Sequence, residues 1–169
     1  MEASGRQIVE LIPRLRRYAR ALTGNVDQAE DLVQDCVERA WGRLHLWQRG
    51  SNMQAWLFTI MHNLHVNSRR RASNRPDVVT MPDWEIGGGV QPIQEHVVEF
   101  HSVIAALYRL PLEQREVLLL VGLEGFAYRE VAEVLGLPIG TVMSRLARGR
   151  ERLREMTEGP AESEMKRSS

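Results

Sequence analysis

Residues 125–154 limit the possible folds of this chain more than any other stretch. They contain two helical patterns separated by Gly136-Leu137-Pro138. Gly136 can take the left-handed conformation that ends a helix, and Pro138 suits the start of the next one. Two short helices joined by such a turn are typical of a helix-turn-helix, a shape that fits the major groove of DNA. We therefore predict helices over residues 128–135 and 138–154.

The second of these helices has an apolar face and an arginine-rich face. The apolar stripe, expected to pack on the core, consists of Ile139, Val142, Leu146, Gly149 and Leu153. On the other side, serine and arginine can read base edges, while flanking arginines suit phosphates. The candidate DNA contacts are Thr141, Ser144, Arg145, Ala147, Arg148 and Arg150. The alternative is a solvated arginine-rich helix of a bundle, against which the turn and the small outward residues argue.

Charge is segregated along a chain that is neutral overall. The 169 residues include 22 acidic and 22 basic side chains. Arginine dominates residues 14–20, 69–75 and 145–154, whereas acidic residues concentrate in 27–38. Such segregation indicates separate surfaces for nucleic acid and for a protein partner.

The composition predicts a cytoplasmic protein without a membrane span. Nothing approaches 18 consecutive apolar residues, and the N-terminus lacks a basic region followed by an apolar run. Cys36 is the single cysteine, which rules out an internal disulfide and fits a reducing compartment.

Helical periodicity runs through most of the chain and predicts an all-α fold. Further helices are expected over residues 6–22, 27–46, 53–71, 93–108 and 112–122. Asp27 and Glu30 have the spacing of a capping box for the second of these helices. The apolar residues of that helix form a stripe: Ala29, Leu32, Val33, Cys36, Val37, Ala40, Trp41 and Leu44.

Two segments lack this periodicity. Prolines and glycines in residues 76–92 indicate a flexible linker, and the small, polar residues 157–169 indicate a disordered tail. We therefore predict two small helical domains, 1–75 and 93–156, the second with the helix-turn-helix. Apolar residues left exposed on both are expected to bring the domains together in the free protein.

The helix over 53–71 combines aromatic, amide and arginine side chains. Rings stack on unpaired bases, amides bond base edges and arginines hold phosphates, so the mixture suits single-stranded nucleic acid. Asn63 and the run Arg69–Arg71 are the candidates, with residues 49–54 as the rim of a base pocket. For Trp56 we favour a place in the core, and a core position for Phe58 is the alternative to stacking.

The helix over 27–46 has an acidic polar face, which repels DNA. It is either a solvated face or a surface for docking another protein. No chemistry of catalysis accompanies these patterns: His62 and His65 lack a third metal ligand, and we find no phosphate-binding loop or nucleophile paired with a base. The sequence predicts no enzyme, no metal site and no cofactor.

Three stretches resemble bacterial sigma factors of the extracytoplasmic-function (ECF) type. They are Asp27–Trp41, Asn52–Asn63, and Leu110–Leu118 with the helix-turn-helix that follows. The resemblance covers most of residues 6–156 and implies binding to core RNA polymerase and to promoter DNA. It also implies an anti-sigma factor that clamps the two domains, and a linker that threads through polymerase.

The resemblance assigns three sets of residues. Those expected to dock on core polymerase are Asp31, Gln34, Asp35 and Glu38. Those expected to bind the melted −10 element are Arg49, Ser51, Asn52, Asn63, Asn67, Arg69, Arg70 and Arg71. The candidates for the −35 duplex are Arg129, Thr141, Met143, Ser144, Arg145, Ala147, Arg148 and Arg150, with Ser144 and Arg148 reading bases.

The chain departs from the family pattern at a few positions. Many members have a basic residue in place of Met143, some have an aromatic in place of Ala147, and Ser is frequent where this chain has Pro138. The −35 sequence it prefers is therefore expected to differ. Two alternatives stay open: a sigma-like mimic that sequesters an anti-sigma factor, and a helix-turn-helix repressor. The intact arginines and the lack of a receiver domain argue against the mimic.

Overall fold

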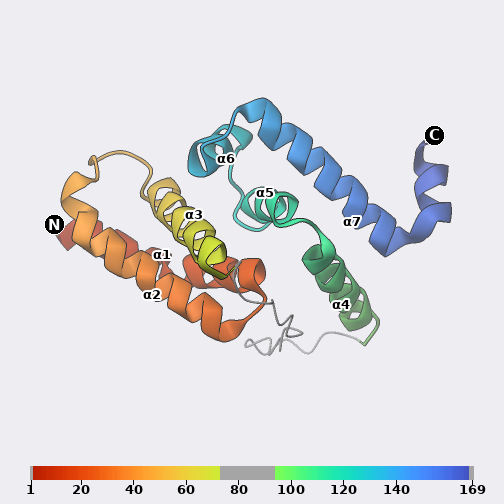
Figure 1. Ribbon diagram of the computed structural model, residues 1–169, viewed down its shortest axis with the longest axis horizontal. Coiled ribbons are helices and arrows are strands. Elements are labelled where there is room, and N and C mark those ends of the chain that lie inside the picture. Colours follow the sequence, from red (N-terminus) through yellow and green to blue (C-terminus); the bar gives the residue numbers. More distant parts are fainter. Residues whose placement is uncertain (1, 73–93, 168–169) are drawn as a thin grey trace.

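The computed structural model describes the backbone of residues 2–72 and 94–167, and side chains of residues 2–72 and 102–158. Within these ranges the regular structure is helical, without strands (Figure 1). The elements are α1 (Glu2–Thr23), α2 (Val26–Arg43), the 3₁₀ turn η1 (Leu44–Leu46), α3 (Met53–Ala72), α4 (Gln94–Arg109), α5 (Leu112–Gly122), α6 (Tyr128–Leu135) and α7 (Ile139–Arg167). The all-α prediction is confirmed, and the predicted linker 76–92 lies outside the described residues.

Helices α1, α2 and α3 form the first bundle, because each carries an apolar stripe at helical spacing. Their fully buried side chains include Leu15, Tyr18, Cys36, Leu57 and Phe58. The predicted stripe of α2 packs on the core as far as Leu44, with Trp41 as the exception. Trp41 is 48% exposed, and its ring lies against Gly5 of α1.

The turn between α1 and α2 depends on Gly24 and Asn25. Glycine is required at position 24 for two reasons. Its φ of +66° lies in the left-handed region that other residues rarely adopt, and a Cβ there would lie 2.8 Å from the ring of Tyr108. The Asn25 side chain accepts a hydrogen bond from the Gln28 amide at 2.9 Å and caps α2. The predicted Asp27–Glu30 capping box is therefore wrong, because the N-cap residue lies two positions before Asp27. The Glu30 side chain instead pairs with arginines of α1.

Asn25→Ala should lower the free energy of unfolding by about 1 kcal/mol, because the first turn of α2 loses its side-chain cap. Chemical denaturation of the full chain would measure the change. Asn67→Ala is the matched control, since Asn67 is an exposed residue inside α3; it should be neutral or slightly stabilising. An equal loss in both variants would contradict the capping role.

The second bundle is built around α5, on which α7 and α6 pack. The predicted helix-turn-helix is confirmed as α6 and α7: Gly136 has a φ of +64°, and the Leu137 amide donates to the carbonyl of Ala132 at 3.0 Å. Val142, Leu146 and Gly149 of the predicted stripe are buried. Ile139, in the first turn, is instead 43% exposed.

Gly149 has a packing role in this bundle. A Cβ at this position would lie 3.0 Å from the side chain of Leu118, so the missing side chain lets α7 approach α5 closely. Helix α7 also runs on to Arg167, beyond the start of the tail that the sequence predicts to be disordered at 157.

The two bundles contact each other directly, α5 against α1 and α6 against α3. Their buried apolar side chains form a single cluster. Phe58 of α3 illustrates the join, because its ring meets Tyr18 of its own bundle at 5.0 Å and Phe126 of the other at 5.2 Å, both edge to face. The expected association of the two domains is therefore present in the structure.

Candidate nucleic-acid interface

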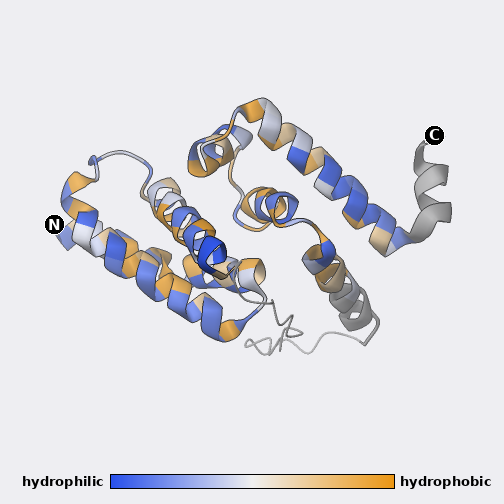
Figure 2. Ribbon diagram, viewed as in Figure 1, coloured by the Kyte–Doolittle hydropathy of each residue, from blue (hydrophilic) through white to orange (hydrophobic). Residues whose placement is uncertain are grey.

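The arginine-rich side of α7 is open to solvent. Met143, Ser144, Ala147, Arg148 and Arg150 are exposed, while Thr141 and Arg145 are partly buried. Figure 2 shows blue hydrophilic residues that alternate with white and orange ones in the coloured part of this helix beyond its first turn. Small side chains at the centre of the exposed face allow a close approach to a groove, and the arginines around it supply positive charge.

Two contacts hold this face in place. The Ser144 hydroxyl donates to the carbonyl of Thr141 at 3.1 Å, and Arg145 lies 3.8 Å from Glu113 of α5. The ion pair orients Arg145 towards α5, whereas Arg148 is exposed to solvent. Arg129 of α6 is exposed as well.

The candidates for single-stranded DNA lie at both ends of α3. The loop residues Arg49, Ser51 and Asn52 are exposed, and the Asn52 side chain accepts from the Ala55 amide at 3.2 Å, which caps α3. Towards the other end, Asn63, Asn67 and the three arginines 69–71 are exposed too. Asn63, Asn67 and Arg70 recur at the spacing of one helix face.

The aromatic residues of α3 pack on the core and do not lie on this exposed surface. Phe58 is 1% exposed and belongs to the core, so it does not stack on a base. Trp56 is partly buried against the core cluster, in line with the favoured core position. Base recognition on α3 would thus depend on amides and arginines.

The two histidines of α3 face the interior of the protein, where one contacts α5 and the other is buried. His62 Nδ1 lies 2.5 Å from a carboxylate oxygen of Glu116 in α5. His65 is buried, and burial, together with the nearby Arg69, lowers its pKa to about 4, so the ring is neutral at pH 7. Within the described residues, no group of three potential ligands is arranged to hold a metal ion.

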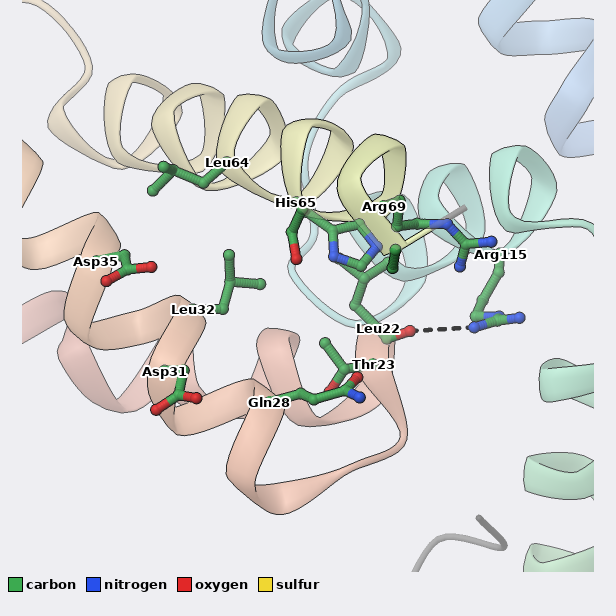
Figure 3. Close-up of a pocket in the computed structure, with 12 residues that line it drawn as sticks. Leu22, Thr23, Gln28, Asp31, Leu32, Asp35, Leu64, His65, Arg69 and Arg115 are labelled. Carbon is green, nitrogen blue, oxygen red and sulfur yellow. Dashed lines mark hydrogen bonds between the residues drawn. The ribbon is translucent and has the colours of Figure 1, made fainter. Parts of the chain in front are cut away.

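The acidic side of α2 faces solvent. Asp31, Gln34, Asp35 and Glu38 are all exposed, and the Gln34 amide donates to Glu38 one turn later at 3.1 Å. Figure 3 shows that Asp31 and Asp35 border a cavity of about 340 Å³ between α2 and α3. Arg115 of α5 reaches the rim of this cavity and donates to the Leu22 carbonyl at 3.1 Å.

The arginines within residues 14–20 of α1 are paired with acids and are not a free basic surface, although the sequence groups them with the other arginine clusters. Arg16 and Arg20 pair with Glu30 of α2. Arg14 and Arg17 pair with Glu124, which follows α5 in the second bundle. Sequence reasoning missed Glu124 and Arg115, for which the local pattern holds no signal.

Comparison with known proteins identifies both bundles. Residues 8–62 match the family described as the Sigma2 domain of PhyR, and residues 100–153 match Sigma-70, region 4. Over 148 residues the chain is 41% identical to the ECF RNA polymerase sigma factor EcfG of Rhodopseudomonas palustris (strain TIE-1), a match that spans 86% of this chain and 80% of EcfG. The chain belongs to the ECF sigma factors.

Further relatives agree with this family. SigE of Mycolicibacterium smegmatis, also an ECF sigma factor, is 33% identical over 84% of this chain and 56% of its own length. Among solved structures, the sigma factor RpoE of Bartonella quintana, in complex with the anti-sigma factor NepR, is 33% identical. It superposes with a TM-score of 0.76 over 95% of this ECF sigma factor and 99% of that chain.

Solved structures also show that the fold of this sigma factor serves proteins with a different role. The anti-anti-sigma factor PhyR of Bartonella quintana matches with a TM-score of 0.59 over 88% of this chain at 18% identity, which shows a shared fold alone. In the part of the chain that the structure describes, no helix is both long and apolar enough to cross a membrane.

Proposed function

We propose that this ECF sigma factor binds core RNA polymerase and directs transcription from promoters whose −35 and −10 elements it reads. The observation that carries the proposal is the 41% identity to EcfG, which extends across both bundles. The exposed charged surfaces of α2, α3 and α7 support it. Bond formation in RNA belongs to polymerase, so the sigma factor needs no catalytic residue, metal or cofactor, and it would act in the cytoplasm beside the enzyme.

The acidic side of α2 is the proposed docking surface for polymerase. Asp31, Gln34, Asp35 and Glu38 form an exposed acidic strip that repels DNA and suits a basic protein surface. Their exposure means that docking would not require α2 to unfold or move within its bundle.

The loop 49–52 and α3 are proposed to bind the melted −10 element. Strand separation costs stacking energy, and a protein that traps unpaired bases shifts the equilibrium towards the melted state. Asn63 would bond a flipped base, with Asn67 beside it. The arginines 69–71 would hold phosphates at the end of the helix.

Helix α7 is proposed to read the −35 duplex. Ser144 and Arg148 would contact base edges, while Arg129, Arg145 and Arg150 would lie near phosphates. Thr141, Met143 and Ala147 would complete the surface in the groove. These contacts hold the promoter in register while the −10 element melts.

An anti-sigma factor is the proposed regulator. RpoE of Bartonella quintana, a relative at 33% identity, was solved in complex with NepR. We expect the regulator of this chain to resemble NepR and to hold the two bundles so that promoter surfaces are hidden.

Reconstitution tests the proposal. Purified chain, bacterial core polymerase and a promoter library should give specific initiation, and the selected promoters would reveal both elements. The match to the Sigma2 domain of PhyR keeps the mimic as a second candidate. Failure to bind core polymerase, with tight binding of a NepR-like protein, would favour the mimic; duplex binding without polymerase would favour a repressor.

A further inference from the structure

Exposed apolar side chains line one edge of the open side of α7. Ile139 is 43% exposed, and Met143, four residues later, is 48% exposed. Ala147, a further four residues along the chain, is exposed as well. Residues four apart in a helix lie one above the other on the same face. The three side chains therefore form a continuous strip, which we call the apolar ridge of α7.

The packing of the second bundle does not account for this ridge. Helix α7 packs on the bundle through a different set of residues, since Val142, Leu146 and Gly149 are buried. A single exposed apolar side chain is common on soluble proteins and needs no explanation. Three of them in register, on a helix otherwise rich in arginine, indicate a contact that the free chain leaves unmade.

The surroundings of the ridge favour DNA as its partner. Arg148 and Arg150 are exposed on either side of it, and arginines that flank a contact surface suit phosphates. The ridge also begins where the helix begins, because Ile139 is the first residue of α7 and Met143 stands in the second turn. The first turns of a recognition helix are the part that reaches base edges in the major groove.

The chemistry of the major groove narrows the contact further. The C5 methyl group of thymine is the apolar group on its base edges, whereas the others are hydrogen-bond donors and acceptors. An apolar side chain would cover a donor or acceptor without replacing its hydrogen bond, which costs free energy. Met143 has a long, unbranched side chain that adapts to the surface it meets, and so suits a methyl group.

The neighbouring Ser144 points to the same kind of base pair. Its hydroxyl donates to the Thr141 carbonyl at 3.1 Å, so the oxygen presents its lone pairs to the groove and can accept from an amino group. Adenine and cytosine carry an amino group on their major-groove edges. The A·T pair is the one that presents both an amino group and a methyl group.

We infer that Met143 contacts a thymine methyl group, so that the −35 element includes an A·T pair beneath the apolar ridge. The inference rests on the proposed function, which gives α7 the −35 duplex, and deepens it by naming a base. Met143 thereby contributes to specificity alongside Arg148, which reads a different position.

Replacement of thymidine by deoxyuridine isolates this contact, because it removes the methyl group and keeps the pairing with adenine. Promoters are first selected from a −35 library with wild-type holoenzyme. They are then remade with deoxyuridine at one thymidine of the −35 element at a time, in either strand. At the position beneath the ridge, binding by wild-type holoenzyme should weaken about fourfold, as expected for one buried methyl group.

Three variants of the full chain decide whether Met143 is the partner of this methyl group. Met143→Ala should bind the thymidine promoter more weakly and lose the response to deoxyuridine. Met143→Leu keeps an apolar side chain of similar size and should retain the response. Val103→Ala is the control, since Val103 is an exposed apolar residue of α4 outside the proposed surfaces; it should respond as wild type does. Circular dichroism checks that all three fold.

The inference is overturned by a selected −35 element without an A·T pair, or by equal binding of thymidine and deoxyuridine promoters at every position. It is overturned as well if Met143→Ala keeps the wild-type response. If that variant instead binds NepR of Bartonella quintana more weakly and promoters normally, the ridge belongs to a protein partner. Failure of wild-type holoenzyme to select any −35 element would defeat the proposed function and this inference together, whereas selection without a methyl response defeats the inference alone.

Discussion

Asp35→Arg should weaken binding to core RNA polymerase at least about tenfold, or about 1.4 kcal/mol. Asp35 is exposed near the middle of the acidic strip on α2, beside the cavity of Figure 3. Reversal of a charge inside a complementary surface replaces attraction with like-charge repulsion, which costs up to several kcal/mol. Titration of fluorescent core polymerase with the variant would measure the change at fixed ionic strength.

Glu10→Arg is the control for this reversal. It makes the same change in net charge at an exposed acid of α1, in the same bundle. We expect little change in polymerase affinity. If Asp35→Arg folds normally and binds core polymerase as wild type does, the acidic strip is not the docking surface.

Arg148→Ala should weaken promoter binding by holoenzyme by about 1–3 kcal/mol and relax the preference at one position of the −35 element. Arg148 is exposed on the open side of α7, one turn after Ser144. An arginine that forms a bidentate contact with a base is difficult to replace, since its loss leaves the base edge without its partner. Binding to a library randomised at −35 would measure affinity and preference together.

Two other arginines of α7 calibrate this result. Arg150→Ala should weaken binding uniformly across −35 sequences and reduce the salt dependence by about one ion, as expected for a phosphate contact. Arg154→Ala removes the same charge further along the helix, where we place no contact. Equal losses in all three variants, with an unaltered −35 preference, would show that α7 contributes charge without reading bases.

The local structure of this chain was predictable because it depends on residues that are close together in the sequence. Apolar periodicity located the helices, and the pair Gly136 and Pro138 located the turn between α6 and α7. Capping was less predictable, since Asn25 and Asp27 are both acceptable N-cap residues, and the structure has Asn25 in that position. The half-exposed Trp41 depends on its neighbour in α1 and not on its own helix.

For the surfaces, exposure of the candidate residues could be predicted, but contacts between the two bundles could not. Exposure of the candidates on α2, α3 and α7 follows from the faces opposite the apolar stripes. The contacts of Glu124 could not be predicted, because its partners Arg14 and Arg17 lie 110 and 107 residues away in the chain. One sequence contains no information on which acid in one bundle meets which arginine in the other. The assignment of individual residues to polymerase or DNA stays a prediction.

The buried carboxylate of Glu124 has a consequence for the thermodynamics of this protein. Its ion pairs are partly shielded from solvent, so salt screens them less than it screens exposed pairs, and added salt should weaken the join between the bundles only modestly. Because the two bundles also share one apolar cluster, they are expected to melt together, with equal calorimetric and van't Hoff enthalpies. One melting temperature would then describe both bundles.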